Sequence, residues 1–509
     1  MRDHVYQRLH VLRILRTMLL GRKSLAIGTA VLLLFSAILI FHIFPGSRDT
    51  SSEWIQRLKG HSRTYCPENI DWLNELDITY PIAYARRDIL VRPTPNAKRD
   101  SITRIHQKLF PRVQSIDIID NAAVALKHCK SPLLLEVPTS SRSNNASNIL
   151  FGLLTTLPNL EIAIPQLRRW LSKLDGQLLA ILTEEEHNGT HRTSSAEADK
   201  VAHLHSHMQE LGMNVRILEA SDFSSSSRVD SLSLVKTLYE NRNNAQWMGL
   251  IDDDTFFPSV SALVSILSRR NPEEKHYIGG LPEGFRDVMH YGLAGHIGAG
   301  VFISMPLAQT MANSYEHCTQ VTQNSIEQRK IMECINELSE IKLAYERSLY
   351  PLNLTGDLSG FFESGRLPTS LHNWKPTSTS KDIYDLPLAH QIADICQECF
   401  LQRWRFNDDI ILTNGYSISR YRKDFLKDIR LDRMEHTMDD VATHEASNNA
   451  GLDHSLGPTR PKLSPNEGKA QHRLIQSKVV DGGLRQSYYH QGLDGGVDGL
   501  LELFWRVET

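Results

Sequence analysis

The sequence has little excess charge of either sign, little cysteine and no internal repeat. Among its 509 residues, 56 are Lys or Arg and 59 are Asp or Glu, so the formal net charge is −3. Proteins that bind nucleic acid or other polyanions usually carry a clear basic surplus, and this class of function is therefore excluded. No coiled-coil heptad is present either. The length is sufficient for one large domain with additions.

Long apolar runs are also scarce, with one exception near the N-terminus. Residues 24–44 carry no charge and end just before Pro45. About 20 apolar residues are enough to cross a bilayer as a helix, and the run is longer than the apolar part of a cleaved signal peptide. Basic residues are frequent before the run, whereas Arg48 is the only one close after it. Since basic flanks stay cytoplasmic, we expect a cytoplasmic tail at 1–23, a transmembrane helix at 24–44 and a lumenal remainder.

This topology makes disulfides possible, because the lumen of the secretory pathway is oxidising. The six cysteines are Cys66, Cys129, Cys318, Cys334, Cys396 and Cys399, and the sequence does not determine their pairing. The last two form a C-x-x-C pair that could close as a disulfide or serve as a metal or redox motif. Glycosylation sequons begin at Asn145, Asn188 and Asn353, and the topology predicts that all three face the lumen.

Short apolar runs alternate with helical patterns in the middle of the chain. Residues 149–156 and 177–183 are typical of strands buried on both faces, and apolar residues between 160 and 174 recur at helical spacing. The alternation predicts an α/β fold with an open, mostly parallel sheet flanked by helices. We expect a stem and lead-in at 45–148 and the folded domain at 149–425. A polar linker and a small β-rich C-terminal appendage should follow at 426–509.

One predicted strand, residues 246–251, runs directly into Asp252, Asp253 and Asp254. In open α/β sheets, ligands bind outside the carboxyl ends of the strands. Carboxylates in a D-x-D pattern can hold a hard divalent cation, which stabilises the negative charge of a leaving nucleoside diphosphate. An acidic triplet alone is more often a solvated turn or a helix cap, but its place after a buried strand favours a site.

Two glycine-rich segments further along contain other candidates. Gly298 and Gly300 lie in Ala-Gly-His-Ile-Gly-Ala-Gly, where glycine permits close backbone approach to a ligand; an ordinary tight turn is the alternative. Asp357 and Glu363 lie in a second such segment, and His372 and Trp374 follow it. An aspartate beside glycine is often only a turn residue, and a lone histidine is often a surface or core group, but their order after the acidic triplet favours a functional role.

Taken together, these motifs resemble the Fringe-like branch of glycosyltransferase family 31, especially its fungal members. The matching segments are WMGLIDDDTFF, YIGGLPE, GHIGAGVFIS, GDLSGFFESGR, SLHNW, LQRWRF and ILTNGYSISRY, within about residues 149–425. The resemblance implies a GT-A fold, an inverting mechanism, a uridine-diphosphate (UDP) sugar donor, Mn²⁺ and a type II anchor in the Golgi or endoplasmic reticulum membrane. Departures from the family pattern are the hydrophilic loop 184–200, the close spacing of Cys396 and Cys399, and residues 407–409.

The resemblance also implies a role for each candidate residue. Asp254 and His372 would bind the metal, and Asp252 and Asp253 would bind the donor, facing either its nucleotide ribose or the metal. Asp357 would be the catalytic base, with Glu363 as its competitor. The residues expected at the acceptor site are Gly298, Gly300, Glu363 and Trp374.

Two functions are compatible with these features. The first is an enzyme, a hexosyl- or N-acetylhexosaminyltransferase that moves a sugar from a UDP-sugar to a hydroxyl of a glycan or glycoprotein. The second is a catalytically inactive lumenal glycan-binding protein with the same fold. The enzyme is favoured because a degenerate site would be expected to have lost one of the acids or the histidine, and all are present. The sequence identifies neither the sugar nor the acceptor.

Overall fold

The protein is described here from a computed structural model. The structure describes residues 66–69 and 81–508, with gaps at 96, 117–122, 127–130, 140–144, 173, 184–194, 220–228, 375–383, 439–452, 464–466, 481 and 493–495. The expected transmembrane helix at 24–44, the cytoplasmic tail and Asn188 lie outside the described residues. Among the helices that are described, none combines the length and the apolar character that a membrane span requires. Apart from two short strands that cross its boundary at Cys66 and Leu126, the elements discussed below belong to one compact unit that comprises residues 67–125 and 130–509.

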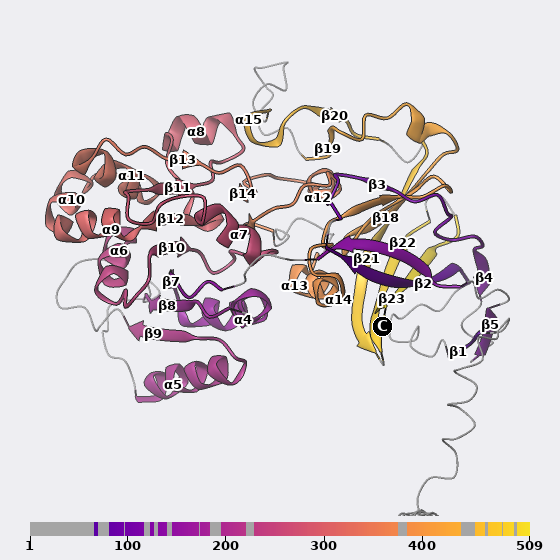
Figure 1. Ribbon diagram of the computed structural model, residues 1–509, viewed down its shortest axis with the longest axis horizontal. Helices are drawn as coiled ribbons and strands as arrows, with labels where there is room; N and C mark the ends of the chain where they lie inside the picture. The colour runs from indigo at the N-terminus through magenta and orange to yellow at the C-terminus, as the bar shows by residue number, and fades with distance from the viewer. Residues whose placement is uncertain are drawn as a thin grey trace, which may run out of the picture. The chain divides into compact units, whose positions relative to one another are not determined.

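Within the described residues, seven strands form the predicted α/β sheet (Figure 1). In spatial order they are β9 (Val215–Glu219), β8 (Gln177–Leu182), β7 (Ile149–Thr155), β10 (Trp247–Ile251), β12 (Val301–Ser304), β11 (Tyr277–Gly279) and β13 (Ala344–Tyr345). The first four are parallel neighbours, β12 is antiparallel to both β10 and β11, and β13 is parallel to β11. The prediction of a mostly parallel sheet in a mixed α/β fold is confirmed.

Helices cover both faces of this sheet because successive strand residues point to opposite sides. On one side, Trp170 of the α4 helix packs with its ring centroid 5.2 Å from Phe151 and 4.9 Å from Phe257. On the other side, Leu150, which precedes Phe151 in the chain, belongs to a separate apolar cluster with Leu238 of α6. The main helices are α4 (Leu157–Leu171), α5 (Ser195–Glu210), α6 (Ser231–Glu240), α7 (Val260–Leu267), α9 (Met305–Asn313), α10 (Tyr315–Val321) and α11 (Glu327–Leu338).

Local sequence signals set the starts of these helices. Thr156 caps α4 by accepting a hydrogen bond from the Asn159 amide, and Pro158 occupies its first turn. Asp230 and Ser233 form a capping box at the start of α6. The shorter helices are α8 (Phe285–Tyr291), η3 (Ile297–Ala299), α12 (Ser359–Phe362), α13 (Leu386–Ala389), η4 (His390–Ile392), α14 (Ala393–Cys396), η5 (Phe425–Lys427) and α15 (Asp453–Leu456).

A second, ten-stranded sheet departs from the expected domain organisation. Its strands come from both ends of the described chain: β2 (Ile82–Thr94), β3 (Thr103–Arg104), β4 (Gln114–Ile116) and β6 (Leu133–Pro138) from the first part, and β16 (Arg403–Arg405), β17 (Ile410–Thr413), β18 (Ser417–Tyr421), β21 (Lys469–Val480), β22 (Gly483–His490) and β23 (Gly499–Val507) from the last. Residues 83–91 pair in parallel with residues 499–507. The strands β2, β3, β4 and β6 of the region 45–148, predicted to be a stem and lead-in, therefore belong to the same sheet as the C-terminal strands, which are not a small separate appendage.

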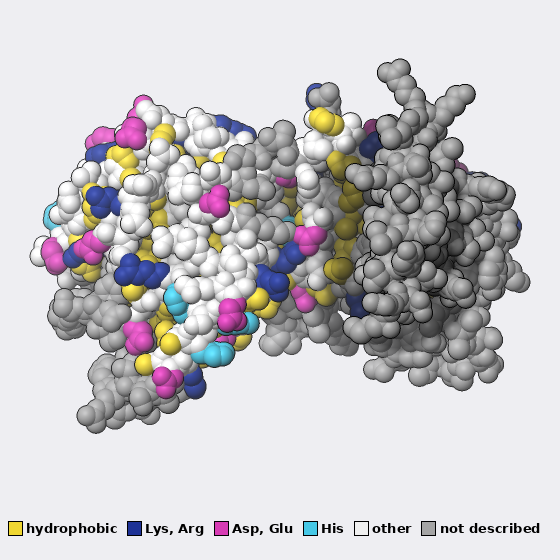
Figure 2. All heavy atoms as spheres, turned by 60° about the horizontal axis from the view of Figure 1, so that its bottom comes forward, with side chains coloured by type: hydrophobic (Ala, Val, Ile, Leu, Met, Phe, Trp, Pro, Cys, Tyr) yellow, Lys and Arg dark blue, Asp and Glu magenta, His cyan; other side chains and the backbone are white. Residues whose placement is uncertain are grey.

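The two sheets share one hydrophobic core. Trp404 and Trp505 of the ten-stranded sheet belong to the same buried cluster as Phe151 and Trp170. Short strands outside the two sheets are β1 (Cys66–Asn69), β5 (Ala123–Leu126), β14 (Leu349–Tyr350), β15 (Ser370–Leu371), β19 (Met434–His436) and β20 (Thr459–Pro461). On the face drawn in Figure 2, acidic and basic side chains are interspersed, in agreement with the balanced composition.

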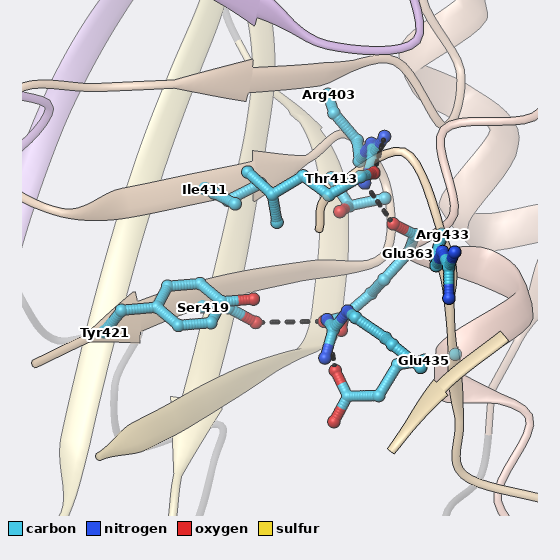
Figure 3. Close-up of a pocket in the computed structure, with 11 residues that line it drawn as sticks. Glu363, Arg403, Ile411, Thr413, Ser419, Tyr421, Arg433 and Glu435 are labelled. Atoms are coloured by element: carbon cyan, nitrogen blue, oxygen red, sulfur yellow. Dashed lines mark hydrogen bonds and ion pairs between the residues drawn. The ribbon is translucent and has the colours of Figure 1, made fainter. Parts of the chain in front are cut away.

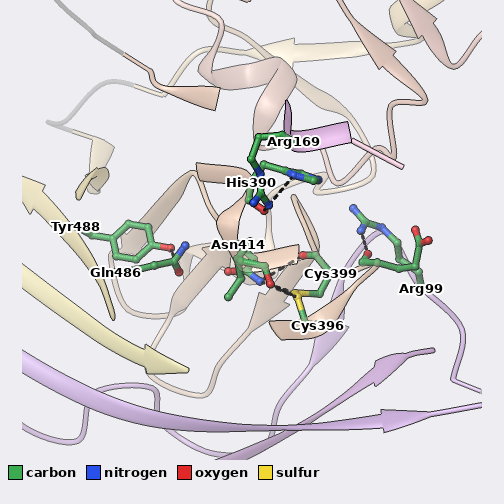
Figure 4. The surroundings of a disulfide bond; sticks show 10 residues. Arg99, Arg169, His390, Cys396, Cys399, Asn414, Gln486 and Tyr488 are labelled. Atoms are coloured by element: carbon green, nitrogen blue, oxygen red, sulfur yellow. Dashed lines mark hydrogen bonds between the residues drawn. A yellow bond between two sulfur atoms is a disulfide. The ribbon is translucent and has the colours of Figure 1, made fainter. Parts of the chain in front are cut away.

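Two disulfides lie among the described residues. Cys318–Cys334 joins α10 to α11, and Cys396–Cys399 closes the C-x-x-C pair (Figure 4). Both cysteines of the second pair are buried, and the Asn414 amide donates a 2.8 Å hydrogen bond to Cys399 Sγ. Because both sulfur atoms are used in the bond, the pair is not a metal-binding motif in this structure. Cys66 and Cys129 lie outside the residues whose side chains are described.

Candidate metal centre

The acidic triplet lies where the sequence predicts it, at the carboxyl end of the buried strand β10. The Thr255 hydroxyl organises the turn, since it accepts from the Asp252 amide at 2.8 Å and donates to the Gly298 carbonyl at 2.7 Å. The turn of the triplet is thereby tied to the glycine-rich loop.

Backbone pairing between two short segments brings His372 close to the acidic triplet. Phe256 and Leu371 exchange two backbone hydrogen bonds of 2.8 Å, and β15 lies parallel to β14. This arrangement places His372 Nε2 2.8 Å from Oδ1 of Asp254 and 3.4 Å from Oδ2 of Asp252. One ligand atom from each of the three residues lies within 4.8 Å of the other two. The predicted metal ligands Asp254 and His372 therefore come together, and Asp252 joins them.

The charges of His372 and the two carboxylates shift one another's pKa values. Burial alone would lower the pKa of His372, but the nearby carboxylates of Asp252 and Asp254 raise it to about 9. Burial acts to raise the pKa of Asp252, whereas His372 lowers it below its usual value. Without a metal, the imidazole therefore carries a proton between two carboxylates at neutral pH. His372 Nδ1 lies 3.2 Å from the Pro351 carbonyl, an acceptor that directs Nε2 toward the acids.

These three residues fit a divalent cation. One imidazole nitrogen and two carboxylates form a donor set suited to such an ion, which would bind the His372 nitrogen in place of its proton. Oδ1 of Asp254 is buried and, in the described part of the chain, has an ion pair but no hydrogen bond of good geometry. Asp252, Asp254 and His372 would hold the ion, which would supply positive charge to a bound diphosphate.

Asp253 is held separately from these ligands. Its carboxylate accepts a 2.8 Å hydrogen bond from the hydroxyl of Thr155 at the end of β7, and the buried Gln166 amide donates to its carbonyl. The sequence analysis missed Thr155 and Gln166. A signal for Gln166 was present, because it is a polar residue on the apolar face of α4. The donor-binding role of Asp253 stays a prediction.

The glycine loop and Trp374 adjoin the metal centre. A Cβ atom on Gly298 would lie 2.4 Å from the His372 ring, so the glycine is required for the ring to fit. Gly300 has a φ of +92°, a conformation that favours glycine, and leads into β12. Trp374 Nε1 donates a 2.8 Å hydrogen bond to the Asp254 carbonyl. Their proposed contact with an acceptor stays a prediction.

Two further residues near the centre had been given no role. The His296 ring centroid is 5.2 Å from that of His372, and burial lowers the pKa of His296 to about 4, so its imidazole is neutral at physiological pH. The buried Glu283 carboxylate accepts hydrogen bonds from the Leu352 and Asn353 amides, each 3.0 Å long. Burial raises the pKa of Glu283 to about 7. A histidine in a loop and a single glutamate are both common in protein sequences. Neither His296 nor Glu283 therefore had a distinctive sequence signal.

Asp357, the predicted base, lies beside two cations of the C-terminal part. Arg473 and Lys462 approach its carboxylate at 3.2 and 3.3 Å, and the Ser359 amide donates to it at 2.9 Å. Burial acts to raise the pKa of Asp357, but Arg473 lowers it below the usual value. The carboxylate is ionised as a base must be, although these partners reduce its basicity. Its catalytic role is still a prediction.

Glu363 belongs to a buried network that joins α12 to the ten-stranded sheet (Figure 3). Its carboxylate accepts from Ser417, Ser419 and Gln471. It also forms a 2.9 Å ion pair with Lys469. Burial acts to raise the pKa of Glu363, but Lys469 and these donors lower it to about 2.

The hollow beside Glu363 is lined by charged and polar residues that include Arg403, Tyr421, Glu435 and Arg460, and it has room only for a water-sized group. A sugar ring does not fit in it. The contacts of Glu363 therefore indicate a structural role, and they lend no support to its assignment as an acceptor-binding residue.

Comparisons with known proteins find similarity among solved structures but not among family models or curated sequences. No model of a known protein family matches the sequence, and no curated protein sequence matches it. Solved structures that resemble part of the chain include the glycosyltransferase GlyE from Streptococcus pneumoniae TIGR4, with 12% identity, a TM-score of 0.30, and coverage of 46% of this chain and 57% of GlyE. Mouse xyloside xylosyltransferase 1 in its apo form has 11% identity, a TM-score of 0.28, and coverage of 44% and 97%.

A glycosyltransferase involved in glycosylation of the major capsid of PBCV-1 has 12% identity, a TM-score of 0.24, and coverage of 45% and 94%. TM-scores this low carry no argument about the present chain. The case for its function rests on the geometry of the site.

Proposed function

We propose that this protein is a metal-dependent glycosyltransferase with a GT-A-like fold, a Fringe-like member of family 31. It would move a sugar, a hexose or an N-acetylhexosamine, from a UDP-sugar to a hydroxyl of a glycan or glycoprotein. The observation that carries the proposal is the convergence of Asp252, Asp254 and His372 within 4.8 Å at the carboxyl end of β10. A cation held there would offset the charge that develops on the leaving UDP. Mn²⁺ is the proposed ion because the donor set includes an imidazole.

The remaining roles follow from this placement. Asp253, with Thr155 behind it, would contact the donor, and Gly298, Gly300 and Trp374 would form the wall toward the acceptor. Asp357 would accept the proton of the acceptor hydroxyl in an inverting displacement. Its support is its ionised state and its place in the loop that follows Asn353.

The proposal is tested with the full-length protein in detergent. UDP release from a panel of UDP-sugars is measured with Mn²⁺ and with a chelator, for the parent and for Asp254→Ala and His372→Ala. We expect metal-dependent UDP release by the parent and a loss of at least about 10²-fold in both variants. A parent protein that binds glycans tightly but releases no UDP from any donor would instead be the inactive glycan-binding protein.

We further propose a single-pass type II location in the Golgi or endoplasmic reticulum membrane. The apolar run at 24–44 and the two described disulfides support it, because disulfides persist in oxidising compartments. Asn145 is exposed, whereas the Asn353 side chain is hydrogen-bonded to Asn373 at 2.8 Å beside the metal centre. Expression with microsomes should give an endoglycosidase-sensitive mass that Asn145→Gln reduces. A membrane-inserted protein with no modified sequon would point to the inverted orientation.

A further inference from the structure

Glu283 is a buried acid for which the proposed reaction has no direct use. It lies in the loop between β11 and α8, and its exposed fraction is 0%. Among the described residues, no ion pair joins it. A buried carboxylate is costly unless its hydrogen bonds offset the loss of water. The groups that donate hydrogen bonds to Glu283 therefore indicate its role.

Both carboxylate oxygens are used on one short segment. Oε1 accepts from the Leu352 amide and Oε2 from the Asn353 amide, each at 3.0 Å. Leu352 is fully buried with a φ of +52°, a left-handed conformation that leucine rarely adopts. Such a conformation persists only where the surroundings hold it, and the Glu283 carboxylate is the group that binds its N–H.

The same segment contacts the supports of two metal ligands. The Pro351 carbonyl lies 3.2 Å from Nδ1 of His372. The Asn353 side chain accepts a 2.8 Å hydrogen bond from that of Asn373, and the Asn373 amide donates to Oδ2 of Asp254 at 3.2 Å. Residues 351–353 thus help to orient His372 by direct contact. They help to orient Asp254 through Asn373.

We propose that Glu283 is a positioning residue of the metal centre, whose carboxylate holds residues 351–353 in the shape that orients His372 and Asp254. This role rests on the proposed metal-dependent function. Among the described residues Glu283 forms no hydrogen bond or ion pair with a metal ligand; it acts through the backbone of the segment, and its charge also interacts with His372. The loss of its hydrogen bonds should therefore weaken metal binding while Asp252, Asp254 and His372 are all still present.

The test compares Glu283→Gln, Glu283→Ala and a matched control in the full-length protein. Glutamine keeps one acceptor oxygen at similar volume, whereas alanine removes both. The control is Glu502→Gln, the same change at a buried glutamate of the ten-stranded sheet, whose carboxylate accepts from the Tyr84 hydroxyl and lies 3.9 Å from Arg485 Nε. Mn²⁺ affinity is measured by calorimetry, and folding by circular dichroism and thermal unfolding.

Partners behind metal ligands typically contribute about 10- to 100-fold in affinity. We expect Glu283→Ala to weaken Mn²⁺ binding by about 10-fold or more, Glu283→Gln to be intermediate, and Glu502→Gln to bind as the parent does. If the alanine variant does not fold, the glutamine variant decides the question. Parent-like Mn²⁺ affinity in a folded Glu283→Gln and Glu283→Ala would overturn the role of Glu283 alone. A parent protein that binds no Mn²⁺ would overturn the metal centre and this role with it.

Discussion

In the proposed metal centre, a proton and a metal ion would compete for the His372 nitrogen between Asp252 and Asp254. The carboxylates raise its pKa to about 9 in the metal-free protein, so the protonated form dominates at neutral pH. A metal can bind only the deprotonated nitrogen. The same charges that attract a cation therefore also retain the proton that it must displace.

This competition predicts the pH dependence of metal binding. Because the folded-state pKa is raised, the proton is bound below about pH 9, and Mn²⁺ affinity should rise by about 10-fold for each pH unit between pH 6 and 8. Calorimetry in buffers of different ionisation enthalpy should detect the release of about one proton per ion at pH 7. An affinity that is flat over this range, with no proton release, would show that His372 is not a ligand.

The two downstream acids should respond differently to loss of charge. Asp357→Asn keeps shape but removes basicity, so we expect transfer to fall by about 10²-fold or more with donor and Mn²⁺ binding intact. The measurements are the transfer rate and the affinity for each ligand. Near-parent transfer by Asp357→Asn, together with an inactive Glu363→Gln that still binds donor, would reverse the two roles.

Glu363→Gln is expected to affect stability instead. The folded-state pKa of Glu363 is depressed to about 2, so its carboxylate stabilises the fold above the unfolded-state value and this stabilisation is lost as the pH falls toward 2. The variant should lower the free energy of unfolding by about 3–5 kcal/mol at pH 7 and flatten its decline below about pH 4.5. Denaturant unfolding at several pH values measures both effects.

At the scale of elements, the centre depends on close packing between η3 and the residue after β15. Gly298→Ala would place a methyl group 2.4 Å from two atoms of the His372 ring, and the ring would have to move. We expect Mn²⁺ affinity to fall by about 10-fold or more. Gly176→Ala is the matched control, because its nearest contact would be 3.2 Å at the opposite end of the sheet.

Calorimetry and thermal unfolding should distinguish the two glycine variants. The Gly298 variant should lose metal affinity with little change in far-UV circular dichroism, and the Gly176 variant should keep parent-like affinity. Equal Mn²⁺ affinity in both would mean that the ring does not need the space that Gly298 leaves.

The elements that the sequence predicted are those with a local signal. β7 and β10 are apolar runs, and the acids follow β10 directly, so both the strands and the edge that bears the site could be read from the chain. β14 and β15 have two residues each and show no periodicity. The backbone pairing that places His372 therefore had no sequence signature. Leu352 has a φ of +52°, a conformation that sequence rules do not assign to a leucine.

At the scale of the whole molecule, the ten-stranded sheet could not be foreseen because its pairing is distant. β2 pairs with β23 across more than 400 positions, and neither strand carries information about its partner. Local patterns identify a strand but leave its register and neighbours open. The stem and lead-in at 45–148 and the C-terminal appendage were predicted as separate parts, whereas described strands of both belong to one sheet.

The shared sheet predicts that the C-terminal strands are needed for folding. A chain that ends at residue 458 lacks β20 to β23, so β2 and β18 each lose a strand partner. Trp404 loses Trp505 from the common core, and Glu363 stays buried without Lys469. A buried charge left without its partner costs about 3–5 kcal/mol, and a lost core tryptophan costs a similar amount. Together these losses approach the whole stability of a typical domain.

We therefore expect the chain that ends at residue 458 to be unfolded and inactive, although it retains Asp252, Asp254 and His372. The control is a chain that ends at Val507, which keeps β23 whole and loses the 2.9 Å hydrogen bond from the Glu508 amide to the Val91 carbonyl and the exposed ion pair between Arg92 and Glu508. Such a pair contributes about 1 kcal/mol or less, so this chain should unfold cooperatively near the parent temperature. Limited proteolysis, thermal unfolding and Mn²⁺ binding compare the two chains. If the chain ending at residue 458 resists proteolysis and binds Mn²⁺ as the parent does, the C-terminal strands are a dispensable appendage after all, and the metal centre depends on the seven-stranded sheet alone.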